Sequence, residues 1–431
     1  MLLGLTVLSL SYVSCAKFAT VRHDSAHLEP APATSHVPPA SFVAPITAKV
    51  PRRKSKQSSL RSVAGARATA PVYGALYAQE YLVDMTVDGQ KFPVIVDTGS
   101  SDTWLVKKGF KCFNLDGVAQ SQSTCSFGSS GFDTSSSPMF KLYPKVSFNI
   151  SYADGEFLTG PVGFDTVSVG GLAVKQQEIG VPDYAAWNGD SVNSGLLGLA
   201  YPELTSVFNT TDPTKASRAN HIPYDPFFFT AVKQGIVEPY FSLSLNRGGS
   251  TKGSQPNLGF LAFGGIAPVP VDKTTVTLPV ERTGSDYWFY TIDVDAYVFS
   301  GSDKTKSRAI LDSGTTLNYL PSRMAAAYNA LFVPRAQLDK ESGIYVVDCA
   351  SAAPEFSVVL GGKRFVVDVR DQVVYAGSDE NGEEVCISGT QDGGVDNGEN
   401  IFILGDVFLH NVVSTFNIKT NEMTVTQRRK Y

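Results

Sequence analysis

The stretch Val94-Ile-Val-Asp97-Thr-Gly-Ser-Ser101 recurs about half a chain later as Ala309-Ile-Leu-Asp312-Ser-Gly-Thr-Thr316. An apolar run followed by Asp, a small residue and Gly predicts a buried strand that ends in a tight turn. One Asp-Ser/Thr-Gly is common and usually marks a polar turn, but two copies in the same setting are not expected by chance. The repeat therefore predicts two facing carboxylates, one from each half of the chain.

A second sequence element follows each aspartate at a similar spacing. Leu-Leu-Gly198 lies about 100 residues after Asp97, and Ile-Leu-Gly405 lies about 93 residues after Asp312. Either triplet alone is ordinary strand sequence. Together with the aspartates, the two triplets predict two related lobes.

Most of the chain beyond residue 71 has strand patterns. Apolar residues alternate on both sides of Asp88-Gly89, which is a strong hairpin signal, and the second arm runs into Asp97. Runs with strand composition continue at 240–245, 258–265 and 287–294. The sequence therefore predicts an all-β fold, with an N-terminal lobe over 71–245 and a C-terminal lobe over 246–431.

Two short helices are expected within this all-β chain. The first is predicted with Asp225 as N-cap, Pro226 at the first helical position and Gly235 at its end. The second is predicted over 322–332.

The composition is that of a large globular protein, because 43% of the 431 residues are apolar and 18% are charged. The apolar stretch at 1–13 is too short to span a bilayer, and small residues follow it, so residues 1–16 are predicted to be a signal peptide. Residues 17–70 are proline-rich and poor in aromatic residues. They are predicted to be a propeptide that forms no core.

Charge divides the leader from the rest of the chain. Residues 1–70 carry nine Lys/Arg and two Asp/Glu, and the remaining residues carry 27 and 39. A basic propeptide is expected to be held on the acidic body near neutral pH and to be released as carboxylates protonate. The alternative is a simple linker.

The paired acid turns, the paired triplets and the segment Ile150-Ser-Tyr152-Ala-Asp-Gly155 resemble the pepsin family of aspartic endopeptidases, especially its secreted fungal branch. The resemblance covers residues 72–431. It implies a bilobal pepsin-like acid protease fold with a cleft between the lobes. It also implies hydrolysis of protein and peptide substrates at acidic pH, with broad preference for hydrophobic residues around the scissile bond.

The chemistry also follows from the residues. Two carboxylates in hydrogen-bonding contact share one proton, because both cannot ionise cheaply. The ionised acid of the Asp97 and Asp312 pair would take a proton from water, and the protonated acid would polarise the scissile carbonyl. The N–H groups of Gly99 and Gly314 can donate to the charged form.

The resemblance assigns supporting roles to the hydroxyl residues. It implies that Ser100 and Thr315 bond the outer oxygens of the aspartates, and that Thr98 and Ser313 cross-link the two turns. A hydroxyl at Thr315 accompanies acidic optima in the family, so maximal activity is expected at acidic pH.

Tyr152 lies where the family has its flap tyrosine, on a hairpin that closes over substrate, and Trp104 resembles the residue that bonds to it. Asp154 matches an acidic flap residue that admits basic side chains before the scissile bond, and its alternative role is a plain turn residue. Ala153 departs from the family, which usually has Gly at this position. The resemblance therefore does not determine the mobility of the flap or the geometry of its hairpin.

Four cysteines remain after the predicted signal, and the family pattern of one disulfide per lobe pairs Cys112 with Cys125 and Cys349 with Cys386. No metal and no cofactor are expected, because the chain has no Cys-x-x-Cys and few histidines. Asn149 and Asn209 begin possible glycan acceptor sites.

The competing class is a binding protein on the same fold, which would not turn over substrate. We expect no nucleic-acid partner and no membrane anchor, because no basic groove, phosphate loop or lipid-anchor signal is present. The protein is expected to act as a monomer that is secreted to the extracellular space, with the vacuole as the alternative location.

Overall fold

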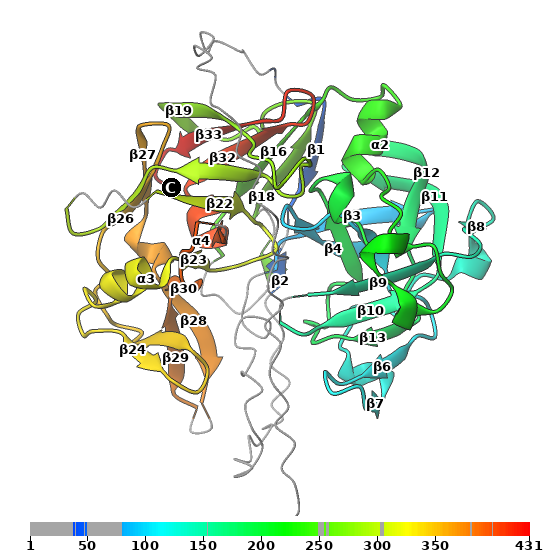
Figure 1. Ribbon diagram of the computed structural model, residues 1–431, viewed down its shortest axis with the longest axis horizontal. Helices are drawn as coiled ribbons and strands as arrows, with labels where there is room; N and C mark the ends of the chain where they lie inside the picture. Colours follow the sequence, from blue (N-terminus) through cyan, green and yellow to red (C-terminus); the bar gives the residue numbers. More distant parts are fainter. Residues whose placement is uncertain are drawn as a thin grey trace, which may run out of the picture.

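The computed structural model describes residues 38, 40–46, 48–49, 80–152, 154–248, 254–255, 258–301, 306–379, 382–398 and 400–431. The predicted signal peptide, the bulk of the propeptide and Ala153 lie outside these residues. Strands dominate, and two β-rich halves lie on either side of a sheet to which both contribute (Figure 1). The prediction of an all-β fold is confirmed.

The N-terminal half is built on two sheets. The seven-stranded sheet closes on itself because β12 pairs with both β5 and β11. In sheet order its strands are β12 (Leu172–Gly180), β5 (Thr103–Leu105), β14 (Gly195–Gly198), β4 (Gln90–Asp97), β3 (Leu82–Val87), β11 (Val162–Val169) and β8 (Lys141–Leu142). The six-stranded sheet contains β15 (Val207–Phe208), β9 (Ser147–Ser151), β10 (Phe157–Gly160), β13 (Tyr184–Ala186), β6 (Lys111–Phe113) and β7 (Ala119–Gln120).

The C-terminal half has three smaller sheets. The first, which carries the second aspartate, contains β20 (Thr291–Val294), β22 (Ser307–Leu311), β31 (Ile401–Leu404), β23 (Asn318–Leu320) and β30 (Thr390–Asp392). The second contains β21 (Ala296–Val298), β26 (Phe356–Leu360) and β27 (Lys363–Val367). The third contains β24 (Gln337–Asp339), β25 (Ile344–Val347), β29 (Glu384–Ser388) and β28 (Val373–Ser378).

The two aspartate strands have equivalent neighbours. β4 runs parallel to β14 with Asp97 opposite Gly198, and β22 runs parallel to β31. β14 then pairs antiparallel with β5, and β31 with β23. A Cβ on Gly198 would lie 2.4 Å from the carbonyl carbon of Ser101, and one on Gly405 would lie 2.3 Å from the carbonyl oxygen of Thr315. Glycine at both positions therefore lets each acid turn pack onto the neighbouring strand.

The hairpin predicted at Asp88-Gly89 is confirmed. Leu82 pairs with Ile95 and Val87 with Gln90, so β3 and β4 are joined by a two-residue loop. Asp88 and Gly89 have φ of +44° and +80°, as a type I′ turn requires.

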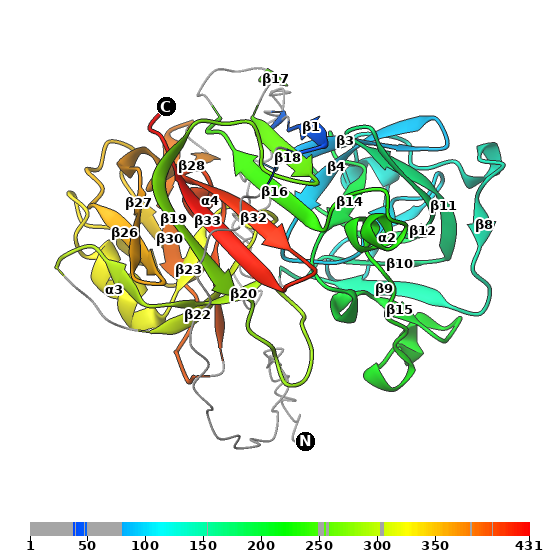
Figure 2. The same cartoon turned by 90° about the horizontal axis from the view of Figure 1, so that it is seen from above.

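A central sheet spans both halves (Figure 2). Its order is β1 (Phe42–Pro45), β18 (Gly259–Phe263), β16 (Tyr240–Leu245), β32 (Val412–Asn417), β33 (Glu422–Arg428) and β19 (Val271–Pro279). A two-stranded sheet joins β2 (Ala48–Lys49) to β17 (Ser254–Gln255).

The expectation that the propeptide forms no core is wrong for residues 42–46. β1 pairs antiparallel with β18, and the side chains of Ala44 and Ile46 are buried. The segment Phe42-Val-Ala-Pro-Ile46 is locally apolar, and Pro45 is tolerated because β1 is an edge strand.

The helices differ from their predicted bounds. α2 (Phe227–Lys233) has Pro226, not Asp225, as its N-cap, and the Asp225 carboxylate instead pairs with Lys233 at 2.6 Å. Gly235, with φ of +69°, follows its C-cap. α3 (Ser322–Asn329) ends three residues early, where the Asn329 side chain donates to the carbonyls of Ala325 and Thr390.

The remaining helices are short. They are α4 (Asp406–Leu409), η1 (Gln122–Thr124), η2 (Thr134–Ser136), η3 (Pro202–Leu204), η4 (Pro213–Lys215), η5 (Arg218–Asn220) and η6 (Val369–Asp371). No helix in the described ranges is long and apolar enough to cross a membrane. The strand expected at 287–294 forms only over Thr291–Val294.

Candidate active site

The two repeated turns meet between the halves of the molecule. Asp97 ends β4, Asp312 follows β22, and their side chains are only 6% and 7% exposed. A Cβ on Gly99 would lie 2.4 Å from Oδ1 of Asp312, and a Cβ on Gly314 would lie 2.6 Å from Oδ1 of Asp97. Each carboxylate therefore lies directly against the glycine of the other turn.

Each aspartate is held by its own turn in the same way. The Gly99 N–H donates to Oδ1 of Asp97 at 2.7 Å, and the Ser100 hydroxyl donates to Oδ2. In the second turn, the Gly314 N–H donates to Oδ1 of Asp312 at 2.8 Å, and the Thr315 hydroxyl donates to Oδ2 at 2.7 Å. These contacts fix both carboxyl planes and favour the charged form.

Thr98 and Ser313 bind each other's backbone. The Ser313 N–H donates to Oγ1 of Thr98 at 3.0 Å, and the Thr98 N–H donates to Oγ of Ser313 at 3.2 Å. The Thr98 hydroxyl donates to the carbonyl of Leu311 and the Ser313 hydroxyl to that of Val96, both at 2.8 Å. Each buried hydroxyl thus satisfies one N–H and one C=O of the opposite half.

The electrostatics of the pair favour a single shared proton. Burial, followed by the charge of Asp312, raises the pKa of Asp97 well above its usual range, although the bonds from Ser100 and Gly99 oppose the rise. Two acids in this position titrate as one coupled pair. The arrangement can therefore supply one general acid and one general base to a group between them.

Tyr152 lies at the tip of the β9–β10 hairpin. The indole N–H of Trp104 donates to the Tyr152 hydroxyl at 2.9 Å, and burial followed by the charge of Asp97 raises the pKa of this phenol. The ring also meets Trp187 edge to face at 5.8 Å. The hydroxyl of Tyr152 is thereby held in place within electrostatic reach of Asp97.

Asp154 is exposed in the hairpin turn, and its Oδ1 accepts the N–H of Glu156 at 3.0 Å. The side chain therefore acts as a turn residue in this structure.

Sequence analysis missed Asp406, the first residue of α4. It is 2% exposed, and its Oδ1 has no hydrogen-bond partner among the described residues. Burial, followed by the charges of Asp312 and Asp97, raises its pKa well above the usual range. A third carboxyl, whose surroundings favour its protonated form, thus lies within electrostatic reach of the pair. The sequence feature that could have drawn attention to Asp406 is its position directly after Gly405, the last residue of the second triplet.

Two disulfides stabilise the loops, one in each half. Cys112 is bonded to Cys125 in the first and Cys349 to Cys386 in the second. In the part of the chain that the structure describes, no cluster of three or more His, Cys, Asp or Glu side chains could hold a metal.

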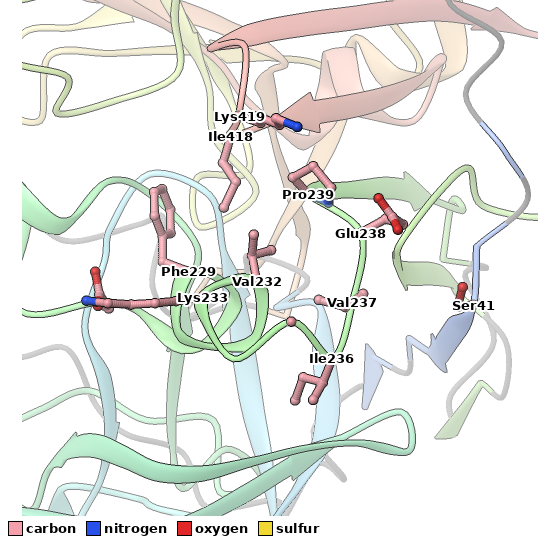
Figure 3. A pocket seen from close by; sticks show the side chains of 12 residues that line it. Ser41, Phe229, Val232, Lys233, Ile236, Val237, Glu238, Pro239, Ile418 and Lys419 are labelled. Atoms are coloured by element: carbon pink, nitrogen blue, oxygen red, sulfur yellow. The ribbon is translucent and has the colours of Figure 1, made fainter.

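A pocket of about 810 Å³ lies beside the C-terminal end of α2 (Figure 3). Phe229, Val232 and Ile418 contribute apolar walls, and Lys233 and Lys419 lie at its edges. None of the predicted site residues lines it. The chemistry is therefore assigned to the two acid turns and not to this pocket.

Comparisons with known proteins agree with this geometry. The family model described as eukaryotic aspartyl protease matches residues 80–428. The "probable aspartic-type endopeptidase" of Aspergillus fumigatus is 38% identical over 359 residues, which cover 80% of this chain and 77% of the relative. Penicillopepsin-1 of Penicillium janthinellum is 30% identical over 335 residues, or 77% of this chain and 90% of the relative.

Endothiapepsin of Cryphonectria parasitica is 31% identical over 359 residues, which cover 82% of this chain and 75% of the relative. Among solved structures, the aspartic proteinase from Irpex lacteus superposes with a TM-score of 0.63. That match covers 81% of this chain and 94% of the other at 20% identity, so it bears on the fold alone.

Proposed function

Because this chain belongs to the eukaryotic aspartyl protease family and is a peptide hydrolase, we propose that it cleaves proteins at acidic pH with a water molecule activated between Asp97 and Asp312. The mutual placement of these two carboxyls against Gly314 and Gly99 is the observation that carries the proposal.

In this mechanism the pair holds one proton. The ionised carboxyl removes a proton from the water as the oxygen attacks the scissile carbonyl, and the protonated carboxyl donates to the carbonyl oxygen. The proton then passes to the departing amine, so no covalent intermediate forms. Ser100, Thr315 and the two glycine N–H groups keep the acids aligned for attack.

The hairpin of Tyr152 is proposed to close over bound peptide and to exclude water. We assign a broad preference for large hydrophobic residues on both sides of the scissile bond. Asp154 would additionally accept Lys before the bond, because its exposed carboxylate can pair with an ammonium group. Cleavage profiling of Asp154→Ser tests this assignment, since unchanged acceptance of Lys would remove it.

We further propose that the protein is made as a zymogen and exported. The positive leader and negative body support the first statement, and the two disulfides support the second. Asn209 is exposed and suits a glycan, whereas the Asn149 amide donates to the Pro213 carbonyl at 2.9 Å and is half-buried. Peptide mapping after glycosidase treatment, which converts a glycosylated Asn to Asp, distinguishes the two acceptors.

The decisive experiment exposes the purified full chain to pH 3–4 with and without pepstatin. Turnover is followed on a denatured protein, and the new N-terminus is determined. We expect acid-dependent digestion and leader removal that pepstatin blocks, and a loss of at least about a hundredfold in Asp97→Asn. A wild-type protein that digests nothing, with Asp97→Asn behaving identically, would instead support a binding protein.

A further inference from the structure

Glu156 is a buried carboxyl that the mechanism above does not use. It follows the turn of the flap hairpin and its side chain is only 4% exposed. Its Oε1 accepts the backbone N–H of Asn188 at 2.7 Å. A side chain of the hairpin is therefore bonded to a separate segment of the same half, residues 187–193.

The backbone of Glu156 is held at two further points. Its carbonyl accepts the N–H of Tyr152 at 2.8 Å, and its own N–H donates to the Asp154 carboxylate at 3.0 Å. Tyr152 and Glu156 thus form the last pair of the hairpin, beyond the pairing of Ser151 with Phe157. Paired residues of a hairpin point to the same face, so the Glu156 bond controls the face that carries the Tyr152 ring.

The segment that receives Glu156 is itself firmly attached. The Gly189 N–H donates to the carbonyl of Cys125 at 3.2 Å, and the Ser191 N–H donates to the carbonyl of Ser126 at 2.6 Å. Cys125 is in turn bonded to Cys112. Trp187, at the start of the segment, touches the ring of Tyr152. Glu156 therefore ties the flap hairpin to a cross-linked support.

The surroundings of Glu156 disfavour its ionised form, although the bond from Asn188 opposes this effect. Burial, followed by the charge of Asp154, raises the pKa of Glu156 to about 8, so the group is neutral in acid. The titratable groups that face it are Asp154 and Tyr152 on its own hairpin and Glu80 on the chain before β3. Glu80 is coupled in turn to Asp190. An ionised Glu156 would therefore meet further acids.

We propose that Glu156 is a positioning residue for the flap, which clasps the hairpin to residues 187–193 and holds Tyr152 over the acid pair. The inference rests on the proposed role of the flap in binding substrate.

The first test measures kcat and KM on a fluorogenic peptide at pH 4. In Glu156→Ala the Asn188 N–H loses its acceptor, and we expect KM to rise about five- to tenfold while kcat changes less than about twofold. Glu156→Gln keeps an acceptor oxygen and should restore KM to within about twofold. A Glu156→Ala variant with the wild-type KM would overturn the proposal.

The second test measures binding without turnover. In the Asp97→Asn background, calorimetry of an uncleaved peptide at pH 4 should show Kd rising about five- to tenfold on adding Glu156→Ala and staying within about twofold on adding Glu156→Gln. An unchanged Kd with Glu156→Ala would overturn the proposal. Glu178→Gln is the matched control, because Glu178 on β12 is half-buried and burial raises its pKa to about 7. It should leave both readouts unchanged.

These outcomes separate the two levels of inference. If the wild-type protein hydrolyses nothing, the proposed function fails, whereas the binding experiment still reports on the flap. If hydrolysis proceeds normally and the Glu156 variants match the wild type, only the role of Glu156 fails. Thermal unfolding of each variant shows that a change in KM does not come from loss of the fold.

Discussion

Replacement of Ser313 by Ala should damage both stability and catalysis, because its hydroxyl serves the opposite half of the molecule. The change removes the acceptor of the Thr98 N–H and the donor to the Val96 carbonyl. Both backbone groups belong to the buried first acid turn, and each unpaired group costs about 1–3 kcal/mol. We therefore expect the free energy of unfolding to fall by about 2–4 kcal/mol.

The catalytic effect follows from the same contacts. Without the cross-link the two turns can shift relative to each other, and a misplacement of about 1 Å can cost about a hundredfold in rate. We expect kcat at pH 4 to fall by about ten- to a hundredfold with a smaller change in KM.

The assay combines urea unfolding with steady-state kinetics. Ser313→Thr is the matched control, because it keeps the hydroxyl and copies the residue that the other turn carries at Thr98. It should recover most of both losses. If Ser313→Ala unfolds within about 0.5 kcal/mol of the wild type and keeps its kcat, the reasoning about the reciprocal bonds is refuted.

Three other predictions concern separate features. Gly99→Ala places a Cβ 2.4 Å from the Asp312 carboxylate and should lower kcat at least about a hundredfold. Gly284→Ala has open space around it but a φ of +69°, so it should lower stability and leave kcat unchanged. Equal effects on kcat would contradict the steric argument. Burial raises the pKa of Asp406, so the folded protein keeps a proton that the unfolded chain loses above about pH 4, and stability should fall as pH rises towards neutrality. Asp406→Asn should reduce that slope in urea unfolding between pH 4 and 7, and an unchanged slope would exclude this contribution. Removal of the Cys349–Cys386 disulfide by a double Ser substitution should lower the free energy of unfolding by about 3–4 kcal/mol, and a loss below about 1 kcal/mol would show that loop entropy contributes little.

The sequence predicted what depends on short patterns. The acid turns and the Asp88-Gly89 hairpin are each specified by residues adjacent in the chain. The repeated triplets predicted two related lobes, and in each half the strand that carries the triplet, β14 or β31, runs parallel to the aspartate strand.

Features that depend on distant partners were not predictable from local patterns. The run from 287 was expected as strand, but Tyr287 stacks on Tyr201 at 5.2 Å and Trp288 lies against the Arg218 guanidinium at 4.4 Å. These tertiary contacts keep residues 287–290 out of the sheet. Likewise, β1 forms only because β18 offers it an edge more than 200 residues away.

Burial of acids was the other feature that local patterns could not reveal. Asp406 and Glu156 look like surface residues in the sequence, and only the packing around them makes them neutral groups near the site. The N-cap of α2 was not predictable from local sequence either. Asp225 was the predicted cap, but Pro226, with an extended backbone, occupies that position, and Asp225 pairs with Lys233.

The order of strands in the central sheet has a consequence for synthesis on the ribosome. The seven-stranded sheet uses residues between 82 and 180 and the short strand at 195–198, so it can form once those residues have emerged. β16, in contrast, cannot pair with β32 until β32 has been synthesised. β19 likewise cannot pair with β33, which ends at Arg428, until translation reaches that residue. The nascent chain therefore exposes apolar strand edges until translation is almost complete, and this interval is when chaperone binding would matter most.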